Sequence, residues 1–212
     1  MGKLTKVFLA LCLLIGIASG VYLSLGGKNN LEVMAIEYDE GKIVKVIARE
    51  VFPVPYKDPE HLLSTGSLVI LGKPIKSENV VTKDSEGILI DHFTLTEVEL
   101  TNVFTDKSGR KYKVGDIIKV AEPTYVVDVR GTGLVKFTID GYEDLEKEKE
   151  YLLVLQEEAG YDELYGIVGL ELGKHELNVS EEMPVLNHTQ PHPANVQKEE
   201  FRVDLFKKFQ LN

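Results

Sequence analysis

The residues from Ser67 to Pro74, SLVILGKP, come within two positions of a phosphate-binding loop. Such a loop needs a glycine, any four residues, then Gly-Lys and a Ser or Thr, so that backbone amides hold the phosphates and the hydroxyl reaches the metal. Here a serine stands first and a proline last, and the proline removes both the hydroxyl and an amide donor. We therefore interpret the run as the interior of a β-strand, and no nucleotide or other cofactor is expected.

Histidines offer a second chemistry, that of a zinc site. His188 and His192 lie four residues apart, the spacing of two zinc ligands on one helical turn, and His175 precedes them. Pro191 stands between the pair and breaks the helix that would align them. The preferred interpretation is a polar loop with no metal, and the alternative is a metal-assisted hydrolase that uses His175, His188 and His192.

Other catalytic patterns are incomplete. Asp91-His92 lacks a nucleophile on a strained Gly-x-Ser-x-Gly turn, and acidic residues near glycine, as in YDEGK, KDSEG and DKSGR, lack the ligand ladder of a calcium loop. We interpret these three as turns and expect a protein that is not an enzyme. Tyr112, Tyr125 and Phe137 could stack bases on a barrel face, but an acidic surface lacks the attraction for phosphate that nucleic acid needs.

The first 27 residues differ from the rest. Lys3 and Lys6 precede an uncharged, mostly apolar stretch over residues 7–25, which is the layout of an export signal. Ala18-Ser19-Gly20 offers a cleavage site, whereas 19 apolar residues are long enough to span a bilayer, so a cleaved signal peptide and a retained membrane anchor both stay open, with the anchor slightly favoured.

Beyond residue 27 the chain has no cysteine, and without Lys3 and Lys6 it carries 22 basic and 34 acidic side chains, a net charge of −12. A cysteine-free exported domain must rely on its core, and this composition suits a Gram-positive bacterium. We expect an extracytoplasmic protein, anchored in the cell membrane or secreted, that does not bind nucleic acid.

The remaining sequence is typical of short β-strands separated by turns. Residues 31–50 predict two strands around a hairpin turn at Asp39-Glu40-Gly41, and Asp58-Pro59 predicts the start of a short helix. The unbroken apolar run Leu68–Leu71 suits a strand buried on both faces, with a bend at Gly72, and the slip in alternation between Leu95 and Val98 predicts a β-bulge. Strands follow within 117–140, at 151–155 and within 164–179, then a loop over 183–197 and an amphipathic helix over 198–209.

The following apolar residues of the central strands are expected to be buried: Leu68, Ile70, Leu95, Val98, Leu100, Ile117, Val120, Leu152 and Val154.

The order of four stretches, DPEHLLSTGSLVILGKPI, TLTEVELTNVF, VGDIIKVAEP and LEKEKEYLLVL, resembles the netrin-like module, the OB-type barrel shared with tissue inhibitors of metalloproteinases. The resemblance covers roughly residues 51–173 and implies a small β-barrel with an exported binding role. The Cys-x-Cys that chelates the target's zinc in the animal inhibitors is absent from VFPVPYKDP, as are the disulfides of that family. Zinc-chelating inhibition therefore does not carry over.

Together these observations predict a mostly β protein with three parts: a signal peptide or anchor over 1–27, an OB-type barrel over 31–180, and a loop with a C-terminal helix over 181–212. The predicted function is a non-catalytic binding module at the cell surface whose partner is a protein or an envelope polymer. The predicted interaction segment is VFPVPYKDP, in which Val51, Phe52, Val54 and Tyr56 would expose apolar area on a proline-stiffened strand. The alternative is that Phe52 and Val54 close the end of the barrel.

Overall fold

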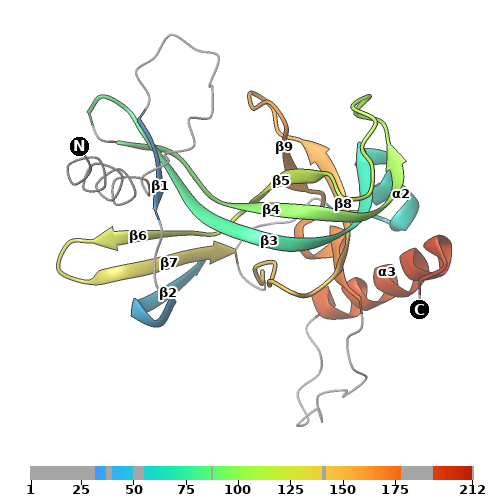
Figure 1. Ribbon diagram of the computed structural model, residues 1–212. Coiled ribbons are helices and arrows are strands. Elements are labelled where there is room, and N and C mark those ends of the chain that lie inside the picture. The colour runs from blue at the N-terminus through green and yellow to red at the C-terminus, as the bar shows by residue number, and fades with distance from the viewer. Residues whose placement is uncertain are drawn as a thin grey trace, which may run out of the picture.

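A computed structural model describes residues 32–36, 40–49, 55–86, 88–139, 142–177 and 193–211, and it confirms a mostly β protein (Figure 1). The strands are β1 (Glu32–Ile36), β2 (Ile43–Arg49), β3 (Leu68–Lys83), β4 (Leu89–Asp106), β5 (Ile117–Glu122), β6 (Tyr125–Val129), β7 (Gly133–Ile139), β8 (Tyr151–Glu157), β9 (Leu164–Ile167) and β10 (Lys174–Glu176). The helices are α2 (Pro59–Thr65) and α3 (Pro193–Phe209), with 3-10 turns η1 (Glu40–Lys42) and η2 (Leu170–Gly173).

Five strands form a ring. β3 pairs with β4, β4 with β5, β5 with β9 and β9 with β8, and β8 pairs back onto β3. The β5–β9 pair is parallel and the other four pairs are antiparallel. β1 extends the sheet beside the far half of β3, and β10 adds to β8. The long β3–β4 ribbon therefore belongs to the ring at one end and projects beyond it at the other (Figure 1).

A smaller three-stranded sheet, in the order β2-β7-β6, lies beside the projecting part of the ribbon. The hairpin expected over residues 31–50 is wrong, because β1 pairs with β3 and β2 pairs in parallel with β7. The buried side chain of Asn79 joins the two sheets: its amide donates to the Val126 carbonyl at 2.7 Å and its carbonyl accepts from the Val126 N–H at 2.7 Å. Both strands of the expected hairpin thus find distant partners in place of each other.

Of the four register shifts in the β3–β4 ribbon, two bear on the sequence predictions. The β3–β4 register shifts between Leu71 and Gly72, as expected from the glycine, and a Cβ at residue 72 would collide with Val98. A bulge also lies where the slip in alternation predicts one, since the β3–β4 register shifts opposite Glu97 and Val98, while β4 pairs with β5 in continuous register there. The extra residue is Ile75, on the facing strand β3. The slip in β4 also marks a change of buried face: Leu95 packs with Phe93 in one cluster, while Val98 faces the barrel interior.

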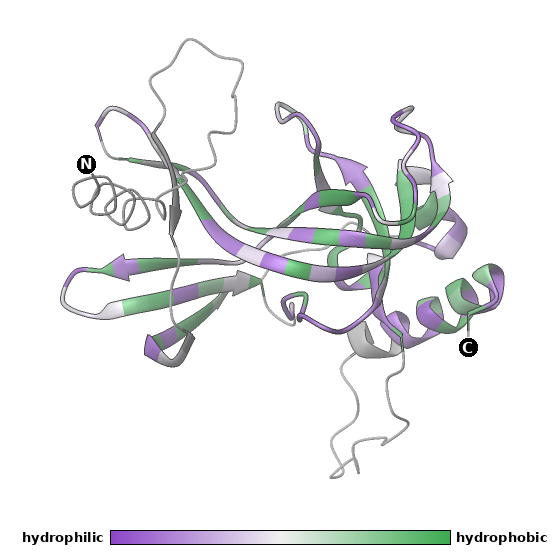
Figure 2. Cartoon of the chain, viewed as in Figure 1, coloured by the Kyte–Doolittle hydropathy of each residue, from purple (hydrophilic) through white to green (hydrophobic). Residues whose placement is uncertain are grey.

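The core has two main layers. The first fills the barrel, and the second lies between the outer side of β3 and β8 and the two α-helices (Figure 2). The runs Leu68–Leu71 and Tyr151–Leu155 are apolar without interruption because alternate residues serve the two layers. Eight of the nine residues expected to be buried are buried; Ile117 is 54 % exposed because Ile118 and Val120 take the inward-facing positions of β5.

The helices cover the outer layer of the core. Asp58 caps α2 by accepting the His61 N–H at 2.8 Å, with Pro59 at the first helical position as expected. α3 begins at Pro193, earlier than expected, and packs its apolar stripe of Phe201, Leu205 and Phe206 against the barrel. Among the residues described above, no helix is both long and apolar enough to cross a membrane. Segment 7–25, with its predicted signal or anchor, lies outside them.

Candidate ligand-binding cleft at the end of the barrel

A cleft of about 230 Å³ opens where the start of β4, the end of β5 and the β8–β9 connection meet. It is lined by Asp91, Phe93, Ala121, Glu122, Pro123, Glu158, Tyr161, Leu164, Gly166, Ile167 and Leu170. Its walls are mostly apolar, with a few acidic groups among them. Small-ligand sites combine an apolar hollow with a few convergent polar groups in the same way, although most are larger, at roughly 300–1,000 Å³.

The aromatic wall of the cleft comes from two elements distant in sequence. Phe93 lies on β4, and Tyr161 lies in the β8–β9 connection, with the two rings edge to face at 5.9 Å between centroids. The Tyr161 hydroxyl donates to the Asp91 carboxylate, and burial together with this bond raises the Tyr161 pKa well above its usual range. The contact fixes the connection against β4, so the wall is formed before any ligand arrives.

Glu122 is the most deeply buried polar group of the cleft, at 1 % exposure. Its carboxylate accepts hydrogen bonds from the Thr96 hydroxyl, from the Tyr142 hydroxyl at 2.9 Å and from the Leu145 backbone N–H at 2.7 Å. Burial raises the pKa of Glu122 above its usual range, although these three donors oppose the shift. Glu122 therefore ties the segment that follows β7 to the floor of the cleft.

A second polar layer lies behind Glu122. The Thr124 hydroxyl donates to Asp144 at 2.7 Å and contacts the Thr94 hydroxyl at 3.0 Å, while Asp144 also pairs with Lys136 of the small sheet. This chain of contacts connects the barrel to the β6–β7 hairpin. Because buried polar groups are costly when unpaired, the network defines one arrangement of these elements.

Glu158 occupies a place that a glycine leaves open. A Cβ at residue 166 would overlap the Glu158 carboxylate, so Gly166 allows this side chain to lie across β9. Three carboxylates, those of Asp91, Glu122 and Glu158, thus line the cleft, and no Lys, Arg or His is among the lining residues. With acidic groups and no basic one along its walls, the cleft disfavours phosphate groups and other anions.

The predicted interaction segment is only partly described. Val51, Phe52 and Val54 lie outside the described residues. Tyr56 is buried at 8 % exposure, in contact with the helix-covered layer of the core, and its backbone carbonyl accepts from the Gln197 side chain at 3.0 Å. The exposure expected for Tyr56 is therefore wrong: its ring packs beside Gly169, where a side chain would leave no room for it.

Of the three histidines in the alternative metal site, only His175 belongs to the described residues. It is buried, with one ring nitrogen 2.8 Å from the Leu172 carbonyl, the other without a partner, and Phe206 of α3 packed edge-on against the ring. Burial lowers its pKa to about 4. His188 and His192 lie outside the described residues, within which no three His, Cys, Asp or Glu side chains come together as a metal site would require.

The remaining candidate residues separate into two places. Tyr112 lies in the β4–β5 loop and accepts a hydrogen bond from Tyr165 at 3.1 Å. Tyr125 and Phe137 stack on the small sheet, 5.0 Å apart, and the half-buried His92 packs against Tyr125. The three aromatics considered for base stacking therefore do not share one face.

Sequence reasoning did not identify the cleft. One signal was available: Glu122 follows Ile118 and Val120 at a spacing of two, which places a carboxylate at an inward-facing position of β5. No comparable sequence pattern identifies Phe93, Tyr161 and Gly166, because these residues come together only when β4 and β9 pair with the two edges of β5.

Comparison of the chain with protein-family models, with curated proteins and with solved structures gives no match.

Proposed function

We propose that this chain is an exported, non-catalytic binding module built on an OB-type barrel, and that the cleft is its ligand site. The observation that carries the proposal is the position of the cleft on the ring of strands. The partner class is a protein or an envelope polymer at the cell surface.

The ring supports the OB assignment through its strand order. If the ring strands β3, β4, β5, β8 and β9 are numbered 1 to 5 in chain order, their order around the ring is 1-2-3-5-4, and strand 4 pairs back onto strand 1. Strands 3 and 5 are parallel. A five-stranded Greek-key barrel of the OB type has this arrangement. The small sheet is then an insertion between strands 3 and 4, contributed by β6 and β7 and completed by β2.

The cleft lies where barrels of this type hold ligands. Their binding face comprises strands 2 and 3 with the loops joining strands 1 to 2 and 4 to 5. Here strands 2 and 3 supply Phe93 and Glu122, and the loop between strands 4 and 5 supplies Glu158 and Tyr161. Loops on a rigid barrel can vary without disturbing the core, which suits them to recognition.

A binding role fits the carboxylates better than catalysis. A general acid or base must exchange a proton with its substrate. Glu122 already accepts three hydrogen bonds from the protein and Asp91 accepts one from Tyr161. Export rests on the composition of residues 1–27 and on the absence of cysteine beyond them.

The test uses the full-length chain immobilised and exposed separately to envelope proteins and to solubilised envelope glycans, with captured material identified by mass spectrometry and sugar analysis. Two variants alter the cleft: Tyr161→Ala removes its aromatic wall, and Gly166→Ala forces the flexible Glu158 side chain to move. Val203→Ala on the exposed side of α3 is the matched control.

Capture of one species by the wild type and the control, reduced at least tenfold in both cleft variants at unchanged thermal stability, supports the proposal. Equal capture by all four proteins would show that the cleft is not the site. Hydrolysis of captured glycan by the wild type would replace the non-catalytic assignment with an enzymatic one.

A further inference from the structure

Beyond the cleft, β2 is an edge strand of the small sheet. It pairs with β7 on one side, and no described strand pairs with it on the other (Figure 1). Alternate backbone N–H and C=O groups along such an edge point away from the sheet, and proteins usually shield them. The register shift between Ile43 and Lys45 leaves Lys45–Arg49 as the regular part of this edge.

The side chains of β2 are unusually exposed for a strand so rich in β-branched residues. Val44 is 62 % exposed and Val46 is 59 % exposed, although both residue types favour burial in sheets. Val44 and Val46 thus leave apolar side chains exposed next to an edge that no described strand pairs with.

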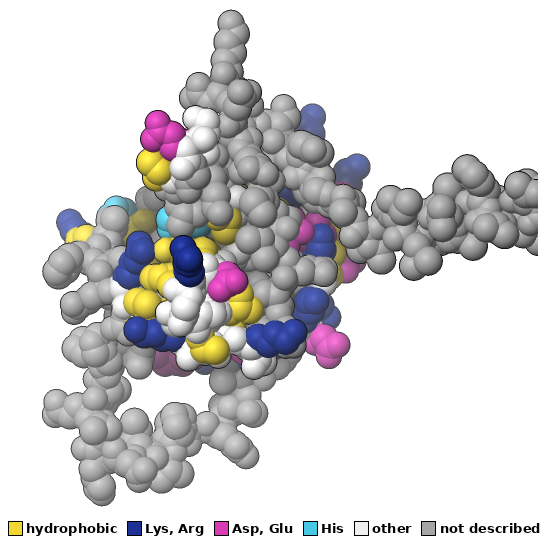
Figure 3. Space-filling model, turned by 90° about the vertical axis from the view of Figure 1, so that its left-hand side faces the viewer, with side chains coloured by type: hydrophobic (Ala, Val, Ile, Leu, Met, Phe, Trp, Pro, Cys, Tyr) yellow, Lys and Arg dark blue, Asp and Glu magenta, His cyan; other side chains and the backbone are white. Residues whose placement is uncertain are grey.

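The edge also carries charge of the opposite sign to the rest of the protein. Residues 42–49 contain Lys42, Lys45 and Arg49 and no acidic side chain, in a chain of net charge −10. Arg49 donates to the Tyr125 hydroxyl at 2.9 Å and lies over the Phe137 ring, so its charge is held in place. Figure 3, which faces this end of the molecule, shows Lys and Arg side chains around exposed hydrophobic ones, with Asp or Glu side chains among them.

Small apolar side chains and basic side chains lie on opposite faces along the regular part of the strand. Val46 and Ala48 lie on one face of the sheet, and Lys45, Ile47 and Arg49 lie on the other. A strand added beside β2 would place its own alternate residues next to these two sets. Cross-strand pairs of opposite charge and of apolar side chains each stabilise such an arrangement.

We propose that the outer edge of β2 binds an extended acidic segment of a partner protein, which adds to the small sheet as a fourth strand. The segment alternates apolar residues, opposite Val46 and Ala48, with acidic residues, opposite Lys45 and Arg49. A peptide is the occupant because only a peptide backbone supplies donors and acceptors at the spacing of the edge. A second copy of β2 is disfavoured because it would bring two basic edges together.

The experiment uses the full-length chain and a fluorescent seven-residue peptide in which Glu and Val alternate, with anisotropy as the readout. Three control peptides test the charge, the alternation and the backbone hydrogen bonds separately. One alternates Lys and Val, one has the same Glu and Val composition in blocks, and one carries N-methyl groups on alternate residues. The N-methyl peptide keeps every side chain but cannot donate along one edge.

The alternating Glu/Val peptide is expected to bind, and raised salt is expected to weaken binding because the charges are exposed. The three control peptides are expected to bind at least tenfold more weakly. Lys45→Glu, which reverses an exposed charge, is expected to weaken binding about tenfold, since it converts attraction into repulsion. Lys119→Glu, on β5 of the barrel, is the matched charge control and leaves binding unchanged.

Failure of the Glu/Val peptide to bind would overturn the proposal. So would equal binding of the N-methyl peptide, or equal binding by the Lys45→Glu variant. Gly166→Ala separates this site from the cleft: peptide binding persists in that variant if β2 is the site, whatever happens to the cleft ligand. Loss of peptide binding in Gly166→Ala alone would place the peptide in the cleft and reject β2.

Discussion

The packing of α3 on the barrel can be tested by truncating one buried side chain of the helix, which leaves every residue of the ring strands unchanged. Leu205 is fully buried, at 0 % exposure, among residues of α2, β3 and β8. Leu205→Ala deletes three carbon groups at roughly 0.8 kcal/mol each, about 2.4 kcal/mol in lost transfer free energy. The cavity left behind increases the loss to about 3–5 kcal/mol of unfolding free energy.

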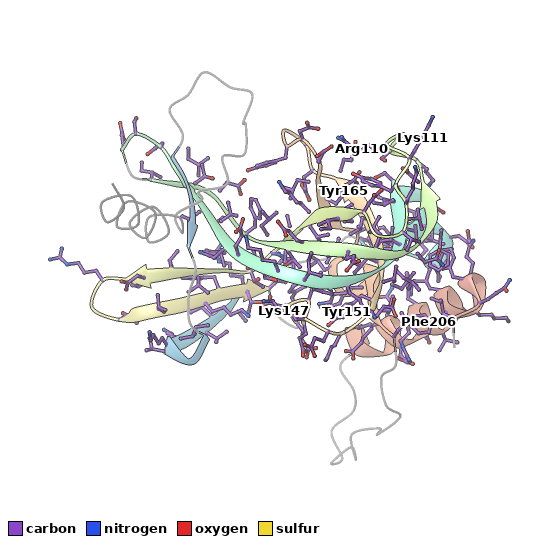
Figure 4. All side chains as sticks on the ribbon, in the orientation of Figure 1. Arg110, Lys111, Lys147, Tyr151, Tyr165 and Phe206 are labelled. Atoms are coloured by element: carbon purple, nitrogen blue, oxygen red, sulfur yellow. The ribbon has the colours of Figure 1, made fainter. Side chains whose placement is uncertain are left out.

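Urea unfolding of the full-length chain, followed by circular dichroism, measures this loss as a lower midpoint at unchanged slope. Val203→Ala is the control, because Val203 lies two residues away on the same helix at 56 % exposure; its effect is expected to stay within about 0.5 kcal/mol. A loss below about 1 kcal/mol for Leu205→Ala would refute the reasoning, because it would mean that α3 does not pack on the barrel. Phe206, which belongs to the same apolar cluster, lies on the side of α3 that faces the sheet (Figure 4).

Two further predictions concern buried titratable groups. Glu122→Gln keeps an oxygen for Tyr142 and Leu145 and removes a buried carboxyl group whose ionisation burial opposes, so its unfolding free energy at pH 7 is expected to be at least that of the wild type. Glu122→Ala leaves three donors unpaired and is expected to lose about 3 kcal/mol or more. Equal urea midpoints for the two variants would contradict this. His175 has its folded-state pKa lowered to about 4, so the unfolded chain binds the proton first and stability falls as pH drops from about 6.5 to 4, by about 3 kcal/mol in all. His175→Gln is expected to remove that part of the pH dependence, and parallel stability curves for wild type and variant between pH 7 and 4 would show that the ring is not buried neutral.

Loop positions illustrate how well local chemistry is read from sequence. KDSEG and DKSGR are turns as expected: Asp84 accepts the N–H groups of Glu86 and Ile88, and Asp106 accepts those of Ser108 and Tyr112. In the second loop Arg110 also reaches carboxylates of the β8–β9 connection (Figure 4). The turn was predictable because Asp bonds its own backbone, whereas the contact of Arg110 depends on how the barrel closes.

Burial likewise depends partly on local pattern, which the sequence shows, and partly on the tertiary fold, which it does not. The alternation of β5 indicates that one face of the strand is apolar. It does not decide which face, because Ile117 and Ile118 are adjacent and either could point inward, and the expectation that Ile117 does so is wrong. The structure chooses Ile118 and Val120 because the barrel interior lies on that side. Pattern alone identifies a strand and its period, and a single misplaced residue inverts which side chains face inward.

The sequence by itself determined the elements of this protein: strands at the apolar runs, a capped helix at Asp58-Pro59, a break at Gly72, and a C-terminal apolar stripe. These follow from local physics, since caps, turns and periodicity depend on residues a few positions apart. Only the tertiary structure decided that β1 and β2 part to separate sheets, that β9 lies parallel to β5, and that Glu122 and Tyr161 face one cleft. Those outcomes depend on pairings between residues far apart in the chain, where many registers satisfy the same local pattern and only the packing of the complete core distinguishes them.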